Sequence, residues 1–89
     1  MTNTVNQLKD IFFYGMATST LQDVRTATLN DEIFLEDVRN RRNATIHLSK
    51  KNFPFIVKKT VNDALMGQQY KVDSIKYHIH GMEVLISPQ

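Results

Sequence analysis

Apolar residues recur at helical spacing near the start of the chain, in the order Val5, Leu8, Ile11/Phe12 and Met16. This period predicts an amphipathic helix from Thr4 to about Ala17. The same region contains the run from Asp10 to Gly15, which is rich in aromatic residues and ends in glycine. A strand is therefore the alternative for those residues.

Residues 19–30 contain signals for a helix and for a strand. Ser19 and Gln22 have the spacing of a capping box, which predicts a short helix over Leu21–Thr28. The β-branched residues of the same segment favour a strand instead. Of the two, we expect the helix.

Two strands are expected next, over Glu32–Val38 and Ala44–Ser49, because both runs are short and rich in apolar residues. The polar residues Arg39–Asn43 would join them as the loop of an antiparallel hairpin. In the second strand, alternation places His47 on the polar face.

The clearest helix signal starts at Pro54, because the missing N–H of proline has no helical partner in the first turn. An apolar stripe follows at helical spacing, and Gly67 is a natural end point. The stripe consists of Phe53, Val57, Val61 and Ala64/Leu65. We expect it to pack against Ile33, Leu35, Ile46, Leu48, Ile75 and Tyr77.

The chain ends with two alternating runs, Tyr70–Tyr77 and Glu83–Ser87, separated by a glycine-containing turn, which predict a second antiparallel hairpin. Together these elements indicate an α+β fold: a small antiparallel sheet of about four strands with two or three helices on one face. If residues 10–15 form a strand, the order becomes the ferredoxin-like β-α-β-β-α-β.

Length and composition indicate a small globular protein. The 89 residues suffice for a single domain, and 42% of them are apolar. There is no cysteine, so disulfides and thiolate sites are excluded. The chain shows neither a signal-peptide pattern nor an apolar run of membrane-spanning length, and we expect a cytoplasmic protein.

Charge is distributed very unevenly along the chain. Residues 1–38 carry a net charge of −4, residues 39–59 carry +7 without a single acid, and residues 60–89 carry −1. The basic residues of the middle stretch, called the basic block below, are Arg39, Arg41, Arg42, Lys50, Lys51, Lys58 and Lys59. Such a block predicts an anionic partner, because arginine and lysine bind phosphate oxygens. No recognition-helix signature is present, which favours RNA or single strands over a duplex groove.

Part of the basic block resembles a ribonuclease motif. Arg42, Asn43 and His47 fit the R-N-x-x-x-H pattern of the HEPN ribonucleases over six residues. The resemblance implies a helical bundle in which Arg42 and His47 are the cleavage residues. In this chain the motif leads into a run expected to be a strand, and we do not expect an enzyme.

The three histidines are the remaining candidates for site chemistry. Converging imidazoles can bind zinc. His47 and His78 are expected on polar strand faces and His80 in a turn, without a carboxylate placed to orient them. We therefore expect neither a metal nor another cofactor.

These observations lead to the hypothesis of a small non-enzymatic regulatory protein that binds RNA or single-stranded nucleic acid through the basic block. The alternative is an inhibitor or antitoxin of the phage or plasmid type, whose basic face binds an acidic protein. A free edge of the predicted sheet would also permit a homodimer.

Overall fold

The computed structural model describes residues 19–89, and they form an α+β fold, as the sequence predicts. Residues 19–29 are helical and are followed by α2 (Glu32–Arg39), β1 (Ala44–Leu48), α3 (Pro54–Leu65), the short 3-10 helix η1 (Met66–Gln68), β2 (Tyr70–His78) and β3 (Gly81–Pro88). The helix expected over residues 4–17 and the alternative strand over residues 10–15 lie outside the described residues.

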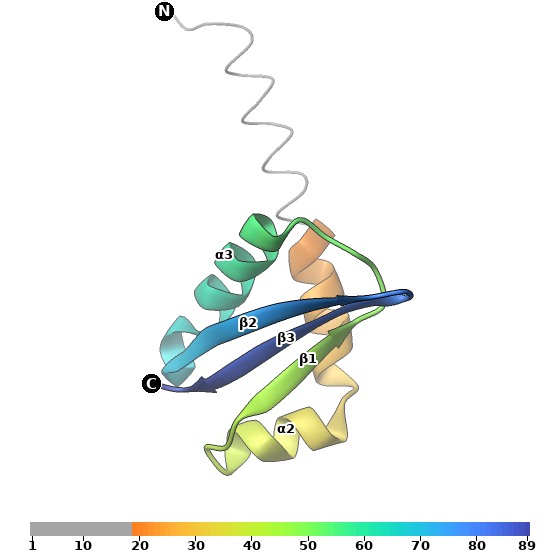
Figure 1. Ribbon diagram of the computed structural model, residues 1–89. Coiled ribbons are helices and arrows are strands. Elements are labelled where there is room, and N and C mark those ends of the chain that lie inside the picture. The colour runs from red at the N-terminus through yellow and green to blue at the C-terminus, as the bar shows by residue number, and fades with distance from the viewer. Residues whose placement is uncertain (1–18) are drawn as a thin grey trace, which may run out of the picture.

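The sheet of the described residues has three antiparallel strands in the order β1-β3-β2, so β3 lies in the centre (Figure 1). Its register places Val84 of β3 beside Ile46 of β1 and Ile75 of β2. Successive residues of a strand point to opposite faces, and the described helices all lie on one face (Figure 1). The opposite face carries mainly polar side chains and is called the open face below.

An irregularity interrupts β2. Its pairing with β3 shifts between Val72 and Ser74, so that Asp73 is an extra residue in a bulge. The Asp73 carboxylate accepts a hydrogen bond of 3.0 Å from the hydroxyl of Ser87 on β3. The bulge is thus attached to the central strand.

The core lies between the covered face of the sheet and the helices. Its largest fully buried side chains are Ile46, Val57, Val61, Met82, Val84 and Ile86. Val24 from residues 19–29 and Phe34 from α2 belong to the same cluster. The predicted apolar stripe of α3 is confirmed at Val57, Val61 and Leu65.

Four side chains expected in the core are exposed over a third or more of their surface. Phe53 precedes the first helical residue, Pro54, and 64% of its surface is exposed. Ile33 and Leu35 of α2 are 76% and 36% exposed, and Tyr77 lies near the end of β2, where it is 46% exposed. The core predicted from the sequence therefore includes four residues that contribute little to the core of the structure.

The strand predicted over residues 32–38 is wrong, because this segment is the helix α2. The Asp31 carboxylate accepts a hydrogen bond of 3.0 Å from the Phe34 amide and caps the helix N-terminus. Phe34 and Val38 lie one turn apart, and both pack in the core. The apolar run around Phe34 fits the spacing of a helix and that of a strand. The Asp31 cap and the packing of Phe34 with Val38 in the core favour the helix.

The end of α2 explains why no hairpin joins this segment to β1. Arg41 adopts the left-handed backbone conformation, with φ of 58°. Its amide donates to the Val38 carbonyl at 3.1 Å, and the Arg42 amide donates to the Asp37 carbonyl at 2.8 Å. These two bonds form a Schellman motif that ends the helix. The described sheet therefore has three strands rather than about four, and α2 stands where the ferredoxin-like order needs a strand.

The other elements predicted within residues 19–89 are confirmed, including the short helix within residues 19–30 and the terminal hairpin. The turn of that hairpin consists of Ile79 and His80, and Gly81 is the first residue of β3. Gly81 lies against the end of β1, where a Cβ atom would overlap the carbonyl oxygen of Leu48. Glycine at this position allows the hairpin turn to approach the end of β1 closely.

Candidate nucleic-acid interface

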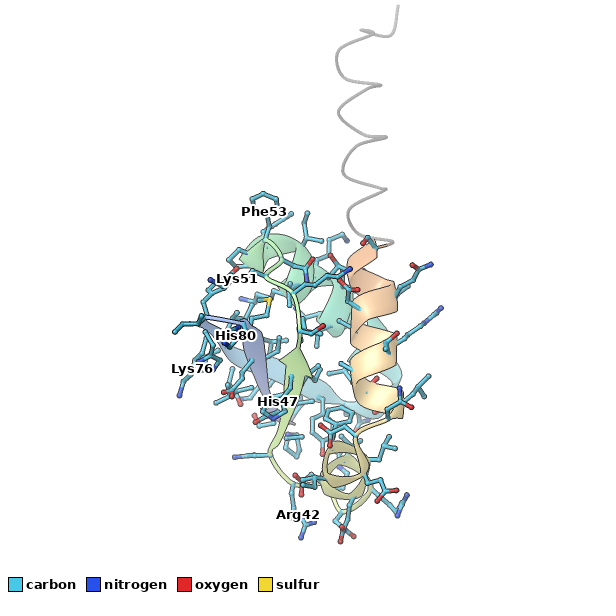
Figure 2. The ribbon with its side chains drawn as sticks, turned by 90° about the vertical axis from the view of Figure 1, so that its right-hand side faces the viewer. Arg42, His47, Lys51, Phe53, Lys76 and His80 are labelled. Atoms are coloured by element: carbon cyan, nitrogen blue, oxygen red, sulfur yellow. The ribbon has the colours of Figure 1, made fainter. Side chains whose placement is uncertain are left out.

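β1 divides the basic block into two groups. Arg39, Arg41 and Arg42 precede the strand and are called the arginine end, whereas Lys50 and Lys51 follow it and are called the lysine end. The five residues of β1 span about 16 Å. Figure 2 shows Arg42 and Lys51 at opposite ends of the described fold.

At the arginine end, Arg41 is bound into the fold. Its guanidinium donates hydrogen bonds to the carbonyl oxygens of Gln68 and Gln69, which lie 27 and 28 residues further along the chain. The guanidinium carbon also lies 5.1 Å from the centroid of the Tyr70 ring, a cation–π distance. Because the carbonyls at the end of a helical segment carry partial negative charge, they attract this cation.

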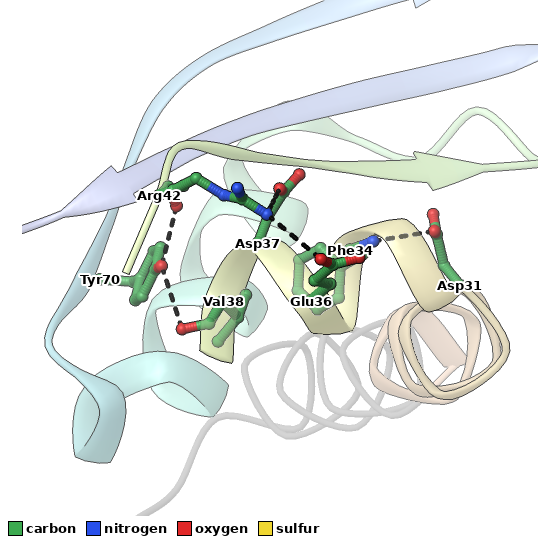
Figure 3. Close-up of polar contacts among 7 residues, drawn as sticks. All are labelled: Asp31, Phe34, Glu36, Asp37, Val38, Arg42 and Tyr70. Carbon is green, nitrogen blue, oxygen red and sulfur yellow. Dashed lines mark hydrogen bonds and ion pairs between the residues drawn. The ribbon is translucent and has the colours of Figure 1, made fainter. Parts of the chain in front are cut away.

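Arg42 pairs with acidic residues of α2 (Figure 3). Its Nη2 atom lies 3.1 Å from a carboxylate oxygen of Asp37 and 3.9 Å from one of Glu36. The Tyr70 hydroxyl donates a hydrogen bond of 2.8 Å to the Arg42 carbonyl, with the Val38 carbonyl 3.5 Å from the same hydroxyl. The charge of Arg42 is therefore offset locally by the acids of α2.

At the lysine end, Lys50 and Lys51 are exposed, and neither contacts an acidic side chain within residues 19–89. Two hydrogen bonds hold the loop that follows them. The Asn52 amide donates to Sδ of Met82 at 3.3 Å, and the Tyr77 hydroxyl donates to the Asn52 carbonyl at 2.6 Å. The loop after β1 is thereby fixed to the terminal hairpin.

Aromatic rings are exposed beside the two lysines. Phe53 follows them in the same loop, and Tyr77 is held there by its bond to the backbone. Figure 2 shows Phe53, Lys51 and His80 towards the same end of the fold. We call Lys50, Lys51, Phe53 and Tyr77 the hairpin-end surface.

The other basic side chains of the block share neither the contacts of Arg41 and Arg42 nor the hairpin-end surface. Arg39 is the last residue of α2 and is exposed. Lys58 and Lys59 lie on the solvent side of α3, where Lys59 pairs with Asp63 at 3.6 Å, one helical turn away. The seven residues therefore do not form one continuous surface.

Sequence reasoning missed the two aromatic members of the hairpin-end surface. For Phe53 a signal was available, because Pro54 at the first helical position places the preceding residue outside the helix. For Tyr77 there was none, since its position depends on a hydrogen bond to a residue 25 positions earlier.

The histidines lie on or near the open face. Nδ1 of His47 is 3.5 Å from Oε1 of Glu83, and Nε2 of His78 is 3.2 Å from the same oxygen. His80 lies in the turn between β2 and β3. In the part of the chain that the structure describes, no group of three His, Cys, Asp or Glu side chains is placed to hold a metal ion.

The R-N-x-x-x-H motif leads into β1 rather than into a helix. Arg42 contacts Asp37, and His47 contacts Glu83 on the neighbouring strand. The HEPN resemblance implies a helical bundle, whereas the described fold is α+β. The fold therefore gives this resemblance no support.

A groove of about 690 Å³ lies among the helices, away from the hairpin-end surface. Its lining is mainly apolar and includes Leu29, Leu35 and Ala64, with the charged residues Arg25 and Asp63. No member of the hairpin-end surface lines it. None of the described helices has the length and apolar character needed to cross a membrane.

The chain matches no protein-family model, and neither a curated protein nor a solved structure shows significant similarity to it. Its function is therefore argued from the geometry and chemistry of the site.

Proposed function

We propose that this chain is a small, non-enzymatic, cytoplasmic regulatory protein that binds RNA or another single-stranded nucleic acid at the hairpin-end surface. The observation that carries the proposal is the position of Lys50 and Lys51, free of acidic partners among the described residues, beside the exposed rings of Phe53 and Tyr77. Lysines bind the phosphates of a strand, and aromatic rings stack on its unpaired bases.

The other basic residues have secondary roles in this proposal. Arg39, Lys58 and Lys59 are exposed and add positive potential that attracts the strand over a longer distance. Arg41 and Arg42 are bound within the fold, and their contribution to affinity is smaller than a count of charges implies.

The experiment is a titration of a labelled single-stranded RNA of about 12 nucleotides, a length within the range that small single-strand binding folds cover. Lys50→Glu combined with Lys51→Glu should weaken binding at least about tenfold and flatten the plot of log K against log salt by about 1.4, since each phosphate contact contributes roughly 0.7. Arg25→Glu, an exposed reversal outside the basic block, should retain binding. A double variant that binds like the unaltered protein would show that the lysine end is not the binding site.

Phe53→Ala tests the single-strand part of the proposal. The ring is mostly exposed, so its removal should leave the melting temperature nearly unchanged. Stacking on one base contributes about 1–3 kcal/mol, and binding to single-stranded RNA should weaken accordingly. Binding to a duplex of equal length serves as the control, because its bases are not available to the ring. Equal losses for both ligands would indicate a general polyanion site.

A second candidate function is inhibition of an acidic protein, as in a phage- or plasmid-type inhibitor or antitoxin. It is favoured by two further exposed apolar side chains near the lysine end, Phe55 and Ile79, with 72% and 85% of their surface exposed. Apolar surface contributes more to a protein interface than to phosphate binding. Purification in about 1 M salt separates the two functions, because nucleic acid would dissociate and a stoichiometric protein partner would remain bound.

A further inference from the structure

The open face of the sheet carries a group of three titratable side chains, one from each strand. His47 of β1 and His78 of β2 approach the same carboxylate oxygen of Glu83 on the central β3, at 3.5 Å and 3.2 Å. Between 51% and 61% of each imidazole and 31% of the carboxylate are exposed. Both imidazoles can therefore reach a ligand in solvent without a change in the fold.

The neighbouring charges on this face are nearly balanced when the imidazoles are neutral. Lys76 lies directly opposite Glu83 in the register, and Lys71 and Asp73 lie further along β2. Two lysines then face two carboxylates, a net charge of zero. The described helices cover the opposite face of the sheet (Figure 1), and within residues 19–89 the ion-pair contacts of these two histidines are those with Glu83. Protonation of His47 and His78 would raise the charge of the open face to +2.

This group lies at the hairpin end of the sheet, close to the hairpin-end surface. His47 of β1 is three residues before Lys50, and His78 follows Tyr77 on β2 but points to the opposite face of the sheet. His80 lies in the turn between β2 and β3. A single strand bound by Lys50 and Lys51 can pass around this end of the sheet and place its next phosphates over the open face.

We propose that His47 and His78 form a proton-dependent phosphate site for the same single strand, with Glu83 holding the two imidazoles in position. The proposal rests on the proposed function above. A protonated imidazole donates an N–H with positive charge to a phosphate oxygen, whereas a neutral one lacks that charge. Glu83 repels phosphate while both imidazoles are neutral and is compensated once they carry protons.

The sign of the pH dependence follows from proton uptake. A phosphate beside the imidazoles stabilises their protonated form, so the complex holds more protons than the free protein. Affinity must then rise as the pH falls and the two imidazoles take up protons.

The experiment measures the Kd of the RNA of about 12 nucleotides from pH 8 to pH 5.5 at constant ionic strength. The unaltered protein should bind about tenfold more tightly at pH 5.5, since uptake of one proton changes affinity by up to tenfold per pH unit. His47→Gln with His78→Gln should remove most of this change. His80→Gln is the matched control, because it removes an imidazole that does not contact Glu83.

Glu83→Gln provides a second test, because this variant should bind the RNA more tightly, whereas the double histidine variant should lose affinity at low pH. Removing the carboxylate should tighten binding at pH 8 by roughly two- to fivefold, the size of one exposed charge interaction. A purely structural role for Glu83 would instead weaken binding at every pH. Melting curves of all variants at pH 8 show whether the fold is retained.

The outcomes separate this inference from the proposed function. Binding by the unaltered protein that does not change between pH 8 and pH 5.5 overturns the phosphate site and leaves the hairpin-end surface intact. Loss of the pH dependence in His80→Gln rather than in the double variant also overturns it. Absence of RNA binding at every pH overturns both.

Discussion

At the start of β1, Arg41 and Arg42 are bound into the fold, whereas Lys50 and Lys51 at its other end remain in solvent. Arg41 donates to backbone carbonyls, and Arg42 pairs with the acids of α2. Lys50 and Lys51 meet no acid among residues 19–89. Basic residues of the same block therefore have different roles: two arginines contact the protein itself, and the lysines remain available to a partner. The number of basic residues in the block overstates how many of them a partner can contact.

The polarity of the helices accounts for this difference. At the arginine end, the C-termini of α2 and of the α3–η1 segment present carbonyl groups with partial negative charge. At the lysine end, α3 begins at Pro54, and a helix N-terminus carries partial positive charge. Cations are thus retained by the protein at one end, and anions are attracted from outside at the other.

The largest effect is expected where the lysine end meets the sheet. Gly81→Ala should destabilise the protein by about 3 kcal/mol, because the new Cβ overlaps the Leu48 carbonyl and forces the turn away from β1. Its φ is not positive, so the cost is steric rather than conformational. Urea unfolding measures the change.

Gly67→Ala is the matched control for this substitution. Within the described part of the chain, no atom beyond its chain neighbours lies within 4 Å of the position of its Cβ, and its φ is also not positive. The variant should be neutral or more stable by up to about 1 kcal/mol. If both glycine variants behaved alike, the close contact between the turn and β1 would be refuted.

An intermediate effect is expected at the arginine end. Arg41→Ala should cost about 1–2 kcal/mol, because it removes two hydrogen bonds and the contact with Tyr70. Arg41→Gly should cost about 1 kcal/mol less than Arg41→Ala, since glycine adopts the left-handed conformation without strain.

Lys51→Ala provides the corresponding measurement at the lysine end. This exposed residue should change stability by less than about 0.5 kcal/mol. Thermal unfolding of the three variants under one condition gives the comparison. Equal losses in Arg41→Ala and Lys51→Ala would remove the distinction between the two ends.

The smallest effect is expected for Arg42→Ala. Its side chain is 54% exposed, and such ion pairs contribute less than about 1 kcal/mol. The loss should be measurable at low ionic strength and disappear near 1 M salt, where charges are screened beyond about 3 Å. A loss that persists in high salt would point to packing rather than to the pair with Asp37.

Local sequence signals were sufficient for most of the described fold. The position of Pro54, the stripe through Val57 and Val61, and the alternation in β1 and in the terminal hairpin each identified an element correctly. The strand predicted over residues 32–38 is wrong because three consecutive apolar residues fit both a helix and a strand. Asp31, which caps the helix, is the residue that distinguishes the two. The error shows that a cap is informative when periodicity is not.

Less of the candidate site could be predicted from the sequence. The charge block directed attention to residues 39–59, which include both lysines of the hairpin-end surface. The hydrogen bonds that distinguish the arginine end from the lysine end join residues 25 to 28 positions apart. Local sequence patterns do not predict such bonds. The convergence of His47 and His78 on Glu83 likewise depends on strand order, which places β3 between β1 and β2.

The bulge at Asp73 has a consequence for the behaviour of the protein at high concentration. An unpaired strand edge is a template for another chain, and regular edges of that kind promote aggregation. In the described sheet, the β2 edge is interrupted by the extra residue and flanked by Lys71 and Lys76, while β1 has only five residues. Both edges are thereby poor templates, which favours colloidal stability in a chain that leaves several large apolar side chains in contact with water.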